Sequence, residues 1–121
     1  MRVAVTGGTG FIGRALVESL SRDGITVHIL TRRAKDTFSV PIRAFHADLT
    51  DPHSCLGPFL NGVDTLYHCA GELRDPKAMR ALHVDGTGRL IDAATSAGIK
   101  CWVQLSSVGA YGPRRSGEVT E

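Results

Sequence analysis

The 121-residue sequence has few cysteines, little net charge and no long apolar run. A formal charge of +2 at pH 7 is too small to indicate binding to nucleic acid or to a membrane surface. The apolar runs are too short to span a bilayer, and an early first strand leaves no room for a secretory signal peptide. The three cysteines form no Cys-x-x-Cys pair, and the histidines lack metal-ligand spacing. We therefore expect a cytoplasmic protein with reduced thiols, no metal, and neither a nucleic-acid nor a membrane partner.

Glycine is abundant, and four glycines gather between positions 7 and 13. Residues 6–13 read T-G-G-T-G-F-I-G, after the apolar run 3–5 and before an amphipathic pattern from Arg14. Strand, glycine-rich turn and helix in this order are typical of a dinucleotide site. Glycine lets the backbone approach a pyrophosphate, and the helix start offers it unpaired N–H groups. The alternative is a structural loop without a ligand, which the flanking strand and helix disfavour.

Apolar patterns predict five strands separated by helices, which suits a single domain over residues 1–121. We predict strands at 2–6, 27–30, 41–46, 65–68 and 100–105, and helices over 14–23, 52–61 and 75–97. Asp51 is the predicted N-cap of the helix over 52–61, and Gly86 is expected to pack closely against a neighbouring element. The pattern predicts an α/β fold, a Rossmann-like doubly wound parallel sheet with strand order 3-2-1-4-5. The ligand should lie across the reversal between the first and fourth strands.

The end of the second strand bears on the choice of cofactor. NAD-preferring Rossmann domains place an acid here to bind the adenosine ribose, whereas this sequence has Thr31 followed by Arg32 and Arg33. Arginine binds a 2′-phosphate through charge-assisted hydrogen bonds, which an acid would repel. We therefore expect NADP, with NAD as the alternative; the competing interpretation is a solvated pair of surface arginines.

The glycine motif resembles that of the short-chain dehydrogenase/reductase superfamily. It is closest in pattern to the extended branch of nucleotide-sugar epimerases, dehydratases and reductases, the NAD-dependent epimerase/dehydratase family. Later segments resemble this family in order: Asp48-Leu49, Cys69-Ala70-Gly71, H-V-D-G-T at 83–87 and S-S-V-G-A-Y-G at 106–112. The resemblance implies that Asp48 and Leu49 contact the adenine. With the arginine argument, the expected cofactor-binding residues are Gly7, Gly10, Phe11, Ile12, Gly13, Thr31, Arg32, Arg33, Asp48, Leu49, Cys69, Ala70 and Gly71.

The same resemblance implies Ser107 as the catalytic serine that bonds the substrate oxygen, with Ser106 as the nearest alternative. It also implies a structural role for His68. His83 departs from the family, which usually has asparagine at this place. The family's Tyr-x-x-x-Lys pair does not follow Ser107, and neither a sixth strand nor a substrate domain is present. We therefore expect residues 1–121 to be the truncated first part of a family member, inactive alone.

The expected function is thus the dinucleotide-binding portion of an NAD(P)-dependent nucleotide-sugar epimerase, dehydratase or reductase. Such an enzyme transfers hydride at a secondary alcohol or ketone of a small-molecule substrate, and family members form homodimers. The alternative, motivated by His83 and the absent pair, is a non-enzymatic relative that uses bound NADP as a structural or redox-sensing ligand.

Overall fold

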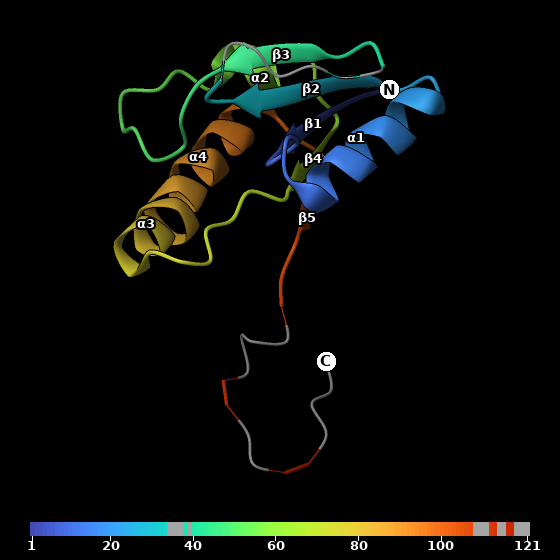
Figure 1. Ribbon diagram of the computed structural model, residues 1–121. Coiled ribbons are helices and arrows are strands. Elements are labelled where there is room, and N and C mark those ends of the chain that lie inside the picture. The colour runs from blue at the N-terminus through green and yellow to red at the C-terminus, as the bar shows by residue number, and fades with distance from the viewer. Residues whose placement is uncertain (34–37, 39, 108–111, 114–115, 118–121) are drawn as a thin grey trace.

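The chain forms a parallel sheet with strand order β3-β2-β1-β4-β5 (Figure 1). The computed structural model describes residues 1–33, 38, 40–107, 112–113 and 116–117. The strands are β1 (Arg2–Thr6), β2 (Thr26–Thr31), β3 (Arg43–His46), β4 (Thr65–His68) and β5 (Cys101–Gln104). Every neighbouring pair is parallel. The predicted α/β Rossmann-like fold and its strand order are confirmed.

Helices cover both faces of the sheet (Figure 1). They are α1 (Phe11–Arg22), α2 (Gly57–Leu60), α3 (Pro76–Arg80), the π-helical turn η1 (Ala81–Gly86) and α4 (Thr87–Ala97). One apolar cluster joins α1 to the sheet through Val3, Val5, Val17, Val27 and Ile29. The other joins α2 and α4 to the opposite face through residues such as Ala4, Leu30, Phe59, Leu66 and Leu90. Continuous apolar strands therefore mark a sheet buried on both sides, as the sequence pattern indicated.

The predicted long helix exists but contains a π-helical turn in its middle. Asp75 caps its start by accepting a hydrogen bond from the Lys77 backbone N–H, and Gly98 ends it in the left-handed region at φ 72°. An ideal Cβ on Gly86 would lie 3.0 Å from the Leu49 carbonyl oxygen. The predicted close packing at Gly86 is confirmed, and it joins the π turn to the segment after β3.

The predicted helix over 52–61 is wrong, because only the single turn α2 is helical. Asp51 is not a helix N-cap: its carboxylate accepts the His53 backbone N–H at 2.8 Å within a turn. Ser54 closes a second local contact, accepting the Asp48 backbone N–H at 3.0 Å. Pro58 cannot lie inside a helix that starts at residue 52, because proline lacks an N–H and clashes with the preceding turn. The helix therefore begins at Gly57, with the proline in its first turn.

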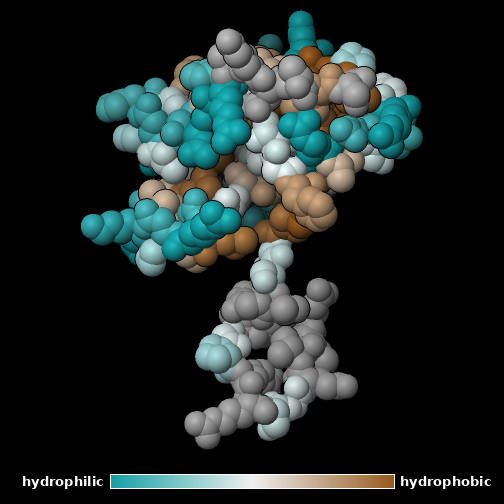
Figure 2. Space-filling model, in the orientation of Figure 1, coloured by the Kyte–Doolittle hydropathy of each residue, from teal (hydrophilic) through white to brown (hydrophobic). Residues whose placement is uncertain are grey.

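Apolar side chains remain exposed at the edge of the sheet where the strands end. Phe11 is 96% and Ile12 52% exposed at the start of α1, and Leu105 just after β5 is 42% exposed. In the view of Figure 2, apolar residues gather along the lower border of the folded domain, where the chain leaves it. Within the described ranges, no helix is both long enough and apolar enough to cross a membrane.

Candidate functional site

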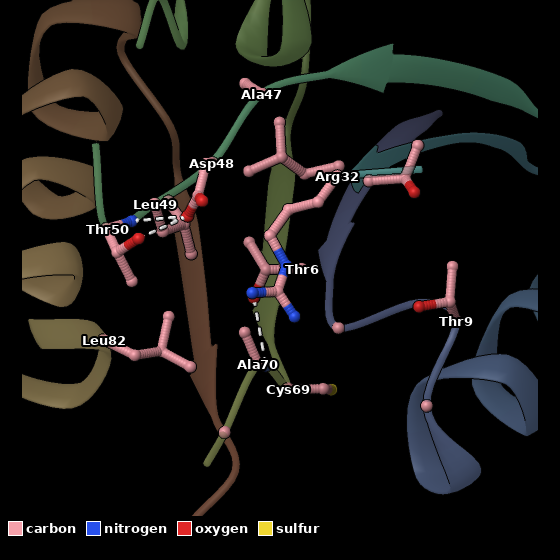
Figure 3. Close-up of a pocket in the computed structure, with 15 residues that line it drawn as sticks. Thr6, Thr9, Arg32, Ala47, Asp48, Leu49, Thr50, Cys69, Ala70 and Leu82 are labelled. Atoms are coloured by element: carbon pink, nitrogen blue, oxygen red, sulfur yellow. Dashed lines mark hydrogen bonds between the residues drawn. The ribbon is translucent and has the colours of Figure 1, made fainter. Parts of the chain in front are cut away.

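A cleft of about 220 Å³ opens at the carboxyl ends of the strands (Figure 3). We call it the carboxyl-edge cleft. Its walls come from the turns that follow β1, β2, β3 and β4, and from η1. The described residues that line it are Thr6, Gly7, Thr9, Gly10, Leu30, Thr31, Arg32, Ala47, Asp48, Leu49, Thr50, Cys69, Ala70, Gly71 and Leu82. Ligands of open α/β sheets bind at this edge, beside the reversal of strand order.

The glycine-rich turn after β1 is packed too closely for other residues. Gly7 has φ 68°, and a Cβ there would lie 2.6 Å from the Ala70 backbone nitrogen. The Gly10 backbone N–H donates to the Gly7 carbonyl at 3.0 Å, which closes the turn. A Cβ on Gly13 would overlap the same carbonyl oxygen. Gly7 therefore shapes the floor of the cleft, while Gly13 lets α1 start directly against the turn.

Helix α1 reaches the cleft through its N-cap residue, which has no side chain. Its N-cap, Gly10, provides no side-chain hydrogen bond, and its first turn contains no acidic residue. Phe11, Ile12 and Gly13 lie outside the residues that line the cleft, and the first two expose their side chains. The first N–H groups of a helix have no intrahelical partner and carry partial positive charge. The local structure thus fits an anionic group above Gly10.

The segment after β2 separates the two predicted arginines. Arg32 lines the cleft, and Figure 3 shows its side chain projecting into it. Arg33 is not among the described lining residues; its backbone N–H donates to the Thr31 hydroxyl at 3.0 Å. The His46 ring Nε2 lies 2.9 Å from the Arg32 carbonyl oxygen and donates to it. These backbone contacts fix the turn from which the Arg32 guanidinium enters the cleft.

Asp48 and Leu49 form the opposite wall. One Asp48 carboxylate oxygen accepts the Thr50 backbone N–H at 2.8 Å and the Thr50 hydroxyl at 2.7 Å (Figure 3). Burial alone raises the pKa of Asp48, but these bonds and the charges of Arg32 and Arg89 outweigh it and lower the pKa. Arg89 also donates through Nε to the Leu49 carbonyl at 3.1 Å. Asp48 is therefore an ionised acceptor held in a fixed position.

Small residues after β4 bring the backbone close to the cleft. The Ala70 backbone N–H donates to the Thr6 hydroxyl oxygen at 3.2 Å, which ties this turn to the end of β1 (Figure 3). Cys69 and Gly71 line the cleft on either side of Ala70. Burial raises the pKa of the Cys69 thiol, so the thiol stays protonated at neutral pH. The turn therefore contributes backbone and shape rather than a nucleophile.

His68 stands behind the cleft in a chain of hydrogen bonds. Its Nδ1 lies 2.6 Å from the Thr6 hydroxyl and its Nε2 lies 2.8 Å from the Thr87 hydroxyl. The Thr87 hydroxyl donates to the Leu82 carbonyl at 3.4 Å, so it accepts from Nε2–H, and Nδ1 accepts from Thr6. The chain links the ends of β1 and β4 to the π turn. This contact pattern agrees with the structural role predicted for His68.

Ser107, the expected catalytic serine, and His83, which replaces the family's asparagine, are not among the described residues that line the cleft. Ser107 is exposed and follows β5 by three residues, and Tyr111 of the same motif lies outside the described residues. His83 Nε2 lies 3.0 Å from both the backbone nitrogen and the carbonyl oxygen of Glu72. His83 therefore ties η1 to the segment after β4, a contact in which asparagine could also take part.

Sequence reasoning missed several residues of the cleft. Thr9 belongs to the glycine motif itself and could have been included with it. Thr50 follows an Asp-x-Thr pattern that is typical of a local side-chain turn, which is a recognisable signal. Leu82 comes from η1, and nothing in its helical spacing indicates that it reaches the site.

We expect the free energy of unfolding to fall as the pH is lowered from 7 to 5. Burial is the main cause that lowers the pKa of both His28 and His68 from 6.5. Below this pH the folded state therefore binds fewer protons at these histidines than the unfolded state does. The stability is thus complete above pH 6.5 and is lost below it, by at most about 1.4 kcal/mol per pH unit for each histidine. Urea unfolding across this range measures the slope. A flat profile in the native sequence would contradict the assignment.

The sheet order and the glycine-lined cleft at its carboxyl edge define a Rossmann-like dinucleotide-binding domain. The sequence pattern of the NAD dependent epimerase/dehydratase family matches residues 3–121. The chain belongs to that family.

Similar proteins agree with this assignment. Sterol demethylase protein B of Methylococcus capsulatus is 34% identical over an alignment that covers 100% of this chain and 39% of that protein. A short-chain dehydrogenase/reductase superfamily protein from Agrobacterium tumefaciens with bound NAD has a TM-score of 0.80 and 32% identity, covering 93% of this chain and 34% of that one. MoeE5, in complex with UDP-glucose and NAD, has a TM-score of 0.78 and 30% identity, covering 95% and 39%. The chain thus spans 34–39% of the length of these proteins.

Proposed function

We propose that residues 1–121 form one NADP-binding domain, the cofactor-binding portion of an NAD(P)-dependent oxidoreductase or epimerase. The observation that carries the choice of NADP is the Arg32 side chain, which projects into the carboxyl-edge cleft beside Thr31 (Figure 3). A guanidinium at this place attracts the 2′-phosphate of NADP, and threonine does not repel it.

The pyrophosphate is proposed to lie over Gly7 and Gly10, against the start of α1. The absence of Cβ atoms leaves room above the turn, and the N–H groups of Phe11, Ile12 and Gly13, which the N-cap side chain does not bond, are proposed to bind the phosphates. This assignment explains how Phe11 and Ile12 contribute through their backbone while their side chains are exposed.

The adenine is proposed to lie between Leu49 and the Asp48 carboxylate. The bonds from Thr50 occupy Oδ1, and no described residue donates to Oδ2. Oδ2 is therefore placed to accept the exocyclic amino group of adenine. Cys69, Ala70 and Gly71 present backbone toward the middle of the cofactor.

The protein that contains this chain is proposed to act on a nucleotide sugar, as the UDP-glucose bound to MoeE5 suggests. NADP supplies the hydride chemistry when bound. Ser107 is proposed to bond the substrate oxygen that gains or loses a proton. A Tyr-x-x-x-Lys pair, which does not follow Ser107 in these residues, would complete proton transfer, so residues 1–121 alone are proposed to bind without turnover.

A second candidate is a non-enzymatic relative that holds NADP as a structural or redox-sensing ligand. Its support is His83, which is bonded to Glu72 where family enzymes usually have asparagine. Turnover in the full-length protein would exclude this candidate.

Arg32→Ala tests the cofactor assignment. We expect NADP affinity to fall by about 10- to 100-fold, because a charge-assisted contact to the 2′-phosphate is lost, while NAD affinity changes little. Calorimetric titration with each dinucleotide measures both. Arg33→Ala is the matched control: it removes the same charge one residue away and should change the NADP-to-NAD ratio much less. Equal affinity of the native protein for both dinucleotides, or an unchanged NADP affinity in Arg32→Ala, would defeat the assignment.

A further inference from the structure

A second cavity of about 420 Å³ lies toward the opposite edge of the sheet, where β1 and β3 begin. We call it the amino-edge cavity. Three of its residues carry or can carry positive charge: Arg2, His28 and Arg43. β1 and β3 both pair with β2, and His28 on β2 is in register with Arg43. The two guanidinium groups therefore come from the strands on either side of His28.

Arg2 is held in place by the segment that follows α2. Its Nη1 donates to the Asn61 carbonyl at 3.2 Å. Gly62 has φ 69°, and a Cβ there would overlap Nη1. The fold thus keeps a side-chain-free position for this guanidinium. Arg2 Nε is buried and has no hydrogen-bond partner among the described residues.

His28, which also lines this cavity, carries a second polar atom without a partner among the described residues. Its side chain is buried, with 2% exposed, and its ring contacts the Phe45 ring at 4.7 Å. Nδ1 donates to the Phe59 carbonyl at 2.8 Å, which leaves Nε2 as an acceptor in the neutral ring. Nε2 is buried and has no partner within the described chain. Buried polar atoms without partners are rare and call for an explanation.

The cavity wall brings no negative charge to balance these groups. None of the described lining residues is acidic. Asp64 accepts from the Arg2 backbone N–H at 3.4 Å, but its carboxylate pairs with Lys100 at 3.3 Å rather than with the guanidinium. Burial, and then the charges of Arg2 and Arg43, lower the pKa of His28 against the opposing effect of its bond to Phe59. The electrostatic potential at the cavity is therefore positive, because Arg2 and Arg43 line it without an acidic residue among the described lining.

We propose that the amino-edge cavity binds a phosphate monoester: Arg2 and Arg43 balance its charge, and His28 Nε2 shares a proton with one phosphate oxygen. A phosphate oxygen that carries hydrogen donates to the neutral imidazole, and a protonated imidazole donates to a bare oxygen. Either arrangement satisfies Nε2. Phe45 and Pro58 form an apolar wall, which suits an organic group attached to the phosphate. This site is distinct from the carboxyl-edge cleft and goes beyond the proposed cofactor function.

Phenyl phosphate and inorganic phosphate are the probes, with chloride at the same ionic strength as the reference. We expect both phosphates to shift the His28 ring resonances in NMR spectra, with phenyl phosphate binding more tightly. Arg43→Gln should weaken binding of each probe by about tenfold, because a charge-assisted hydrogen bond is lost. Arg43 is exposed and lies outside the dinucleotide cleft, so NADP affinity should stay unchanged.

Arg80→Gln is the matched control, since it removes the same charge from exposed α3. If Arg80→Gln and the native protein bind the phosphates equally well, the binding depends on the charges at the amino-edge cavity and not on the total charge of the protein. Tighter binding of phenyl phosphate than of inorganic phosphate supports a monoester as the ligand. Equal or weaker binding of phenyl phosphate overturns the assignment of a monoester. No response at His28, or equal weakening by Arg43→Gln and Arg80→Gln, overturns the site itself.

Discussion

Gly13→Ala is expected to lower the free energy of unfolding by about 2–3 kcal/mol, and Gly88→Ala is expected to raise it by about 0.5–1 kcal/mol. Both glycines lie in helices, so intrinsic helix propensity favours alanine at each. Their surroundings differ. A Cβ on Gly13 would overlap the Gly7 carbonyl oxygen and lie 2.7 Å from the Gly7 carbonyl carbon, whereas one on Gly88 meets no atom within 4 Å.

The two variants should also separate stability from binding. The Gly7 turn must move to accept a Cβ at position 13, and that turn forms the proposed pyrophosphate site, so NADP affinity should fall by more than about tenfold in Gly13→Ala. Gly88→Ala should bind NADP as the native protein does. Urea unfolding and calorimetric titration measure the two effects. Equal unfolding midpoints for both variants would show that the contact between α1 and the turn is not tight.

The fold was predictable because its signals are local. The run Val3–Val5 is apolar without alternation, which indicates a parallel strand covered on both faces. Asp75 and Gly98 mark the ends of the long helix through capping residues that need no tertiary information. Such signals are sufficient for the order of elements, and a glycine-rich turn after the first strand is sufficient to locate the cleft.

The secondary-structure predictions fail where two local patterns favour different structures, or where contacts between residues far apart in the sequence determine the structure. The helix predicted over 52–61 fails because Asp51 and Ser54 bond the nearby backbone and Pro58 forbids a helical interior. The π turn at Ala81–Gly86 depends on tertiary contacts of Gly86 with Leu49 and of Thr87 with His68. No periodicity in the sequence reports these contacts.

Some residues of the carboxyl-edge cleft can likewise be predicted from the sequence, whereas others are found only from the fold. Two arginines after a strand indicate a positive group near the cleft, but only the fold shows that Arg32 enters it while Arg33 is not among the described lining residues. Leu82 joins the cleft from a helix far along the chain. Side chains of this kind are found only when the packing of elements is known.

His68→Phe is expected to lower the free energy of unfolding by about 2–4 kcal/mol, because the buried Thr6 hydroxyl and the half-buried Thr87 hydroxyl each lose one partner. Phenylalanine keeps an aromatic ring against Trp102, where the native rings pack at a centroid distance of 5.6 Å. The variant therefore removes the hydrogen bonds to Thr6 and Thr87 while it fills the site with a somewhat larger aromatic ring. Urea unfolding at pH 7 measures the change, and His53→Phe at an exposed position is the control, expected to be near neutral.

A double-mutant cycle with Thr87→Val distinguishes a hydrogen-bonded chain from simple packing. Once His68 no longer donates, the half-buried Thr87 hydroxyl lacks that partner, so replacing it with a methyl should cost much less than in the native protein. We expect a coupling of about 0.5–3 kcal/mol between the two sites. Additive effects would mean that the Thr6–His68–Thr87 chain contributes nothing beyond the shape of its side chains. Coupling, by contrast, would show that the polar chain holds the π turn, and with it Leu82, against the end of the sheet.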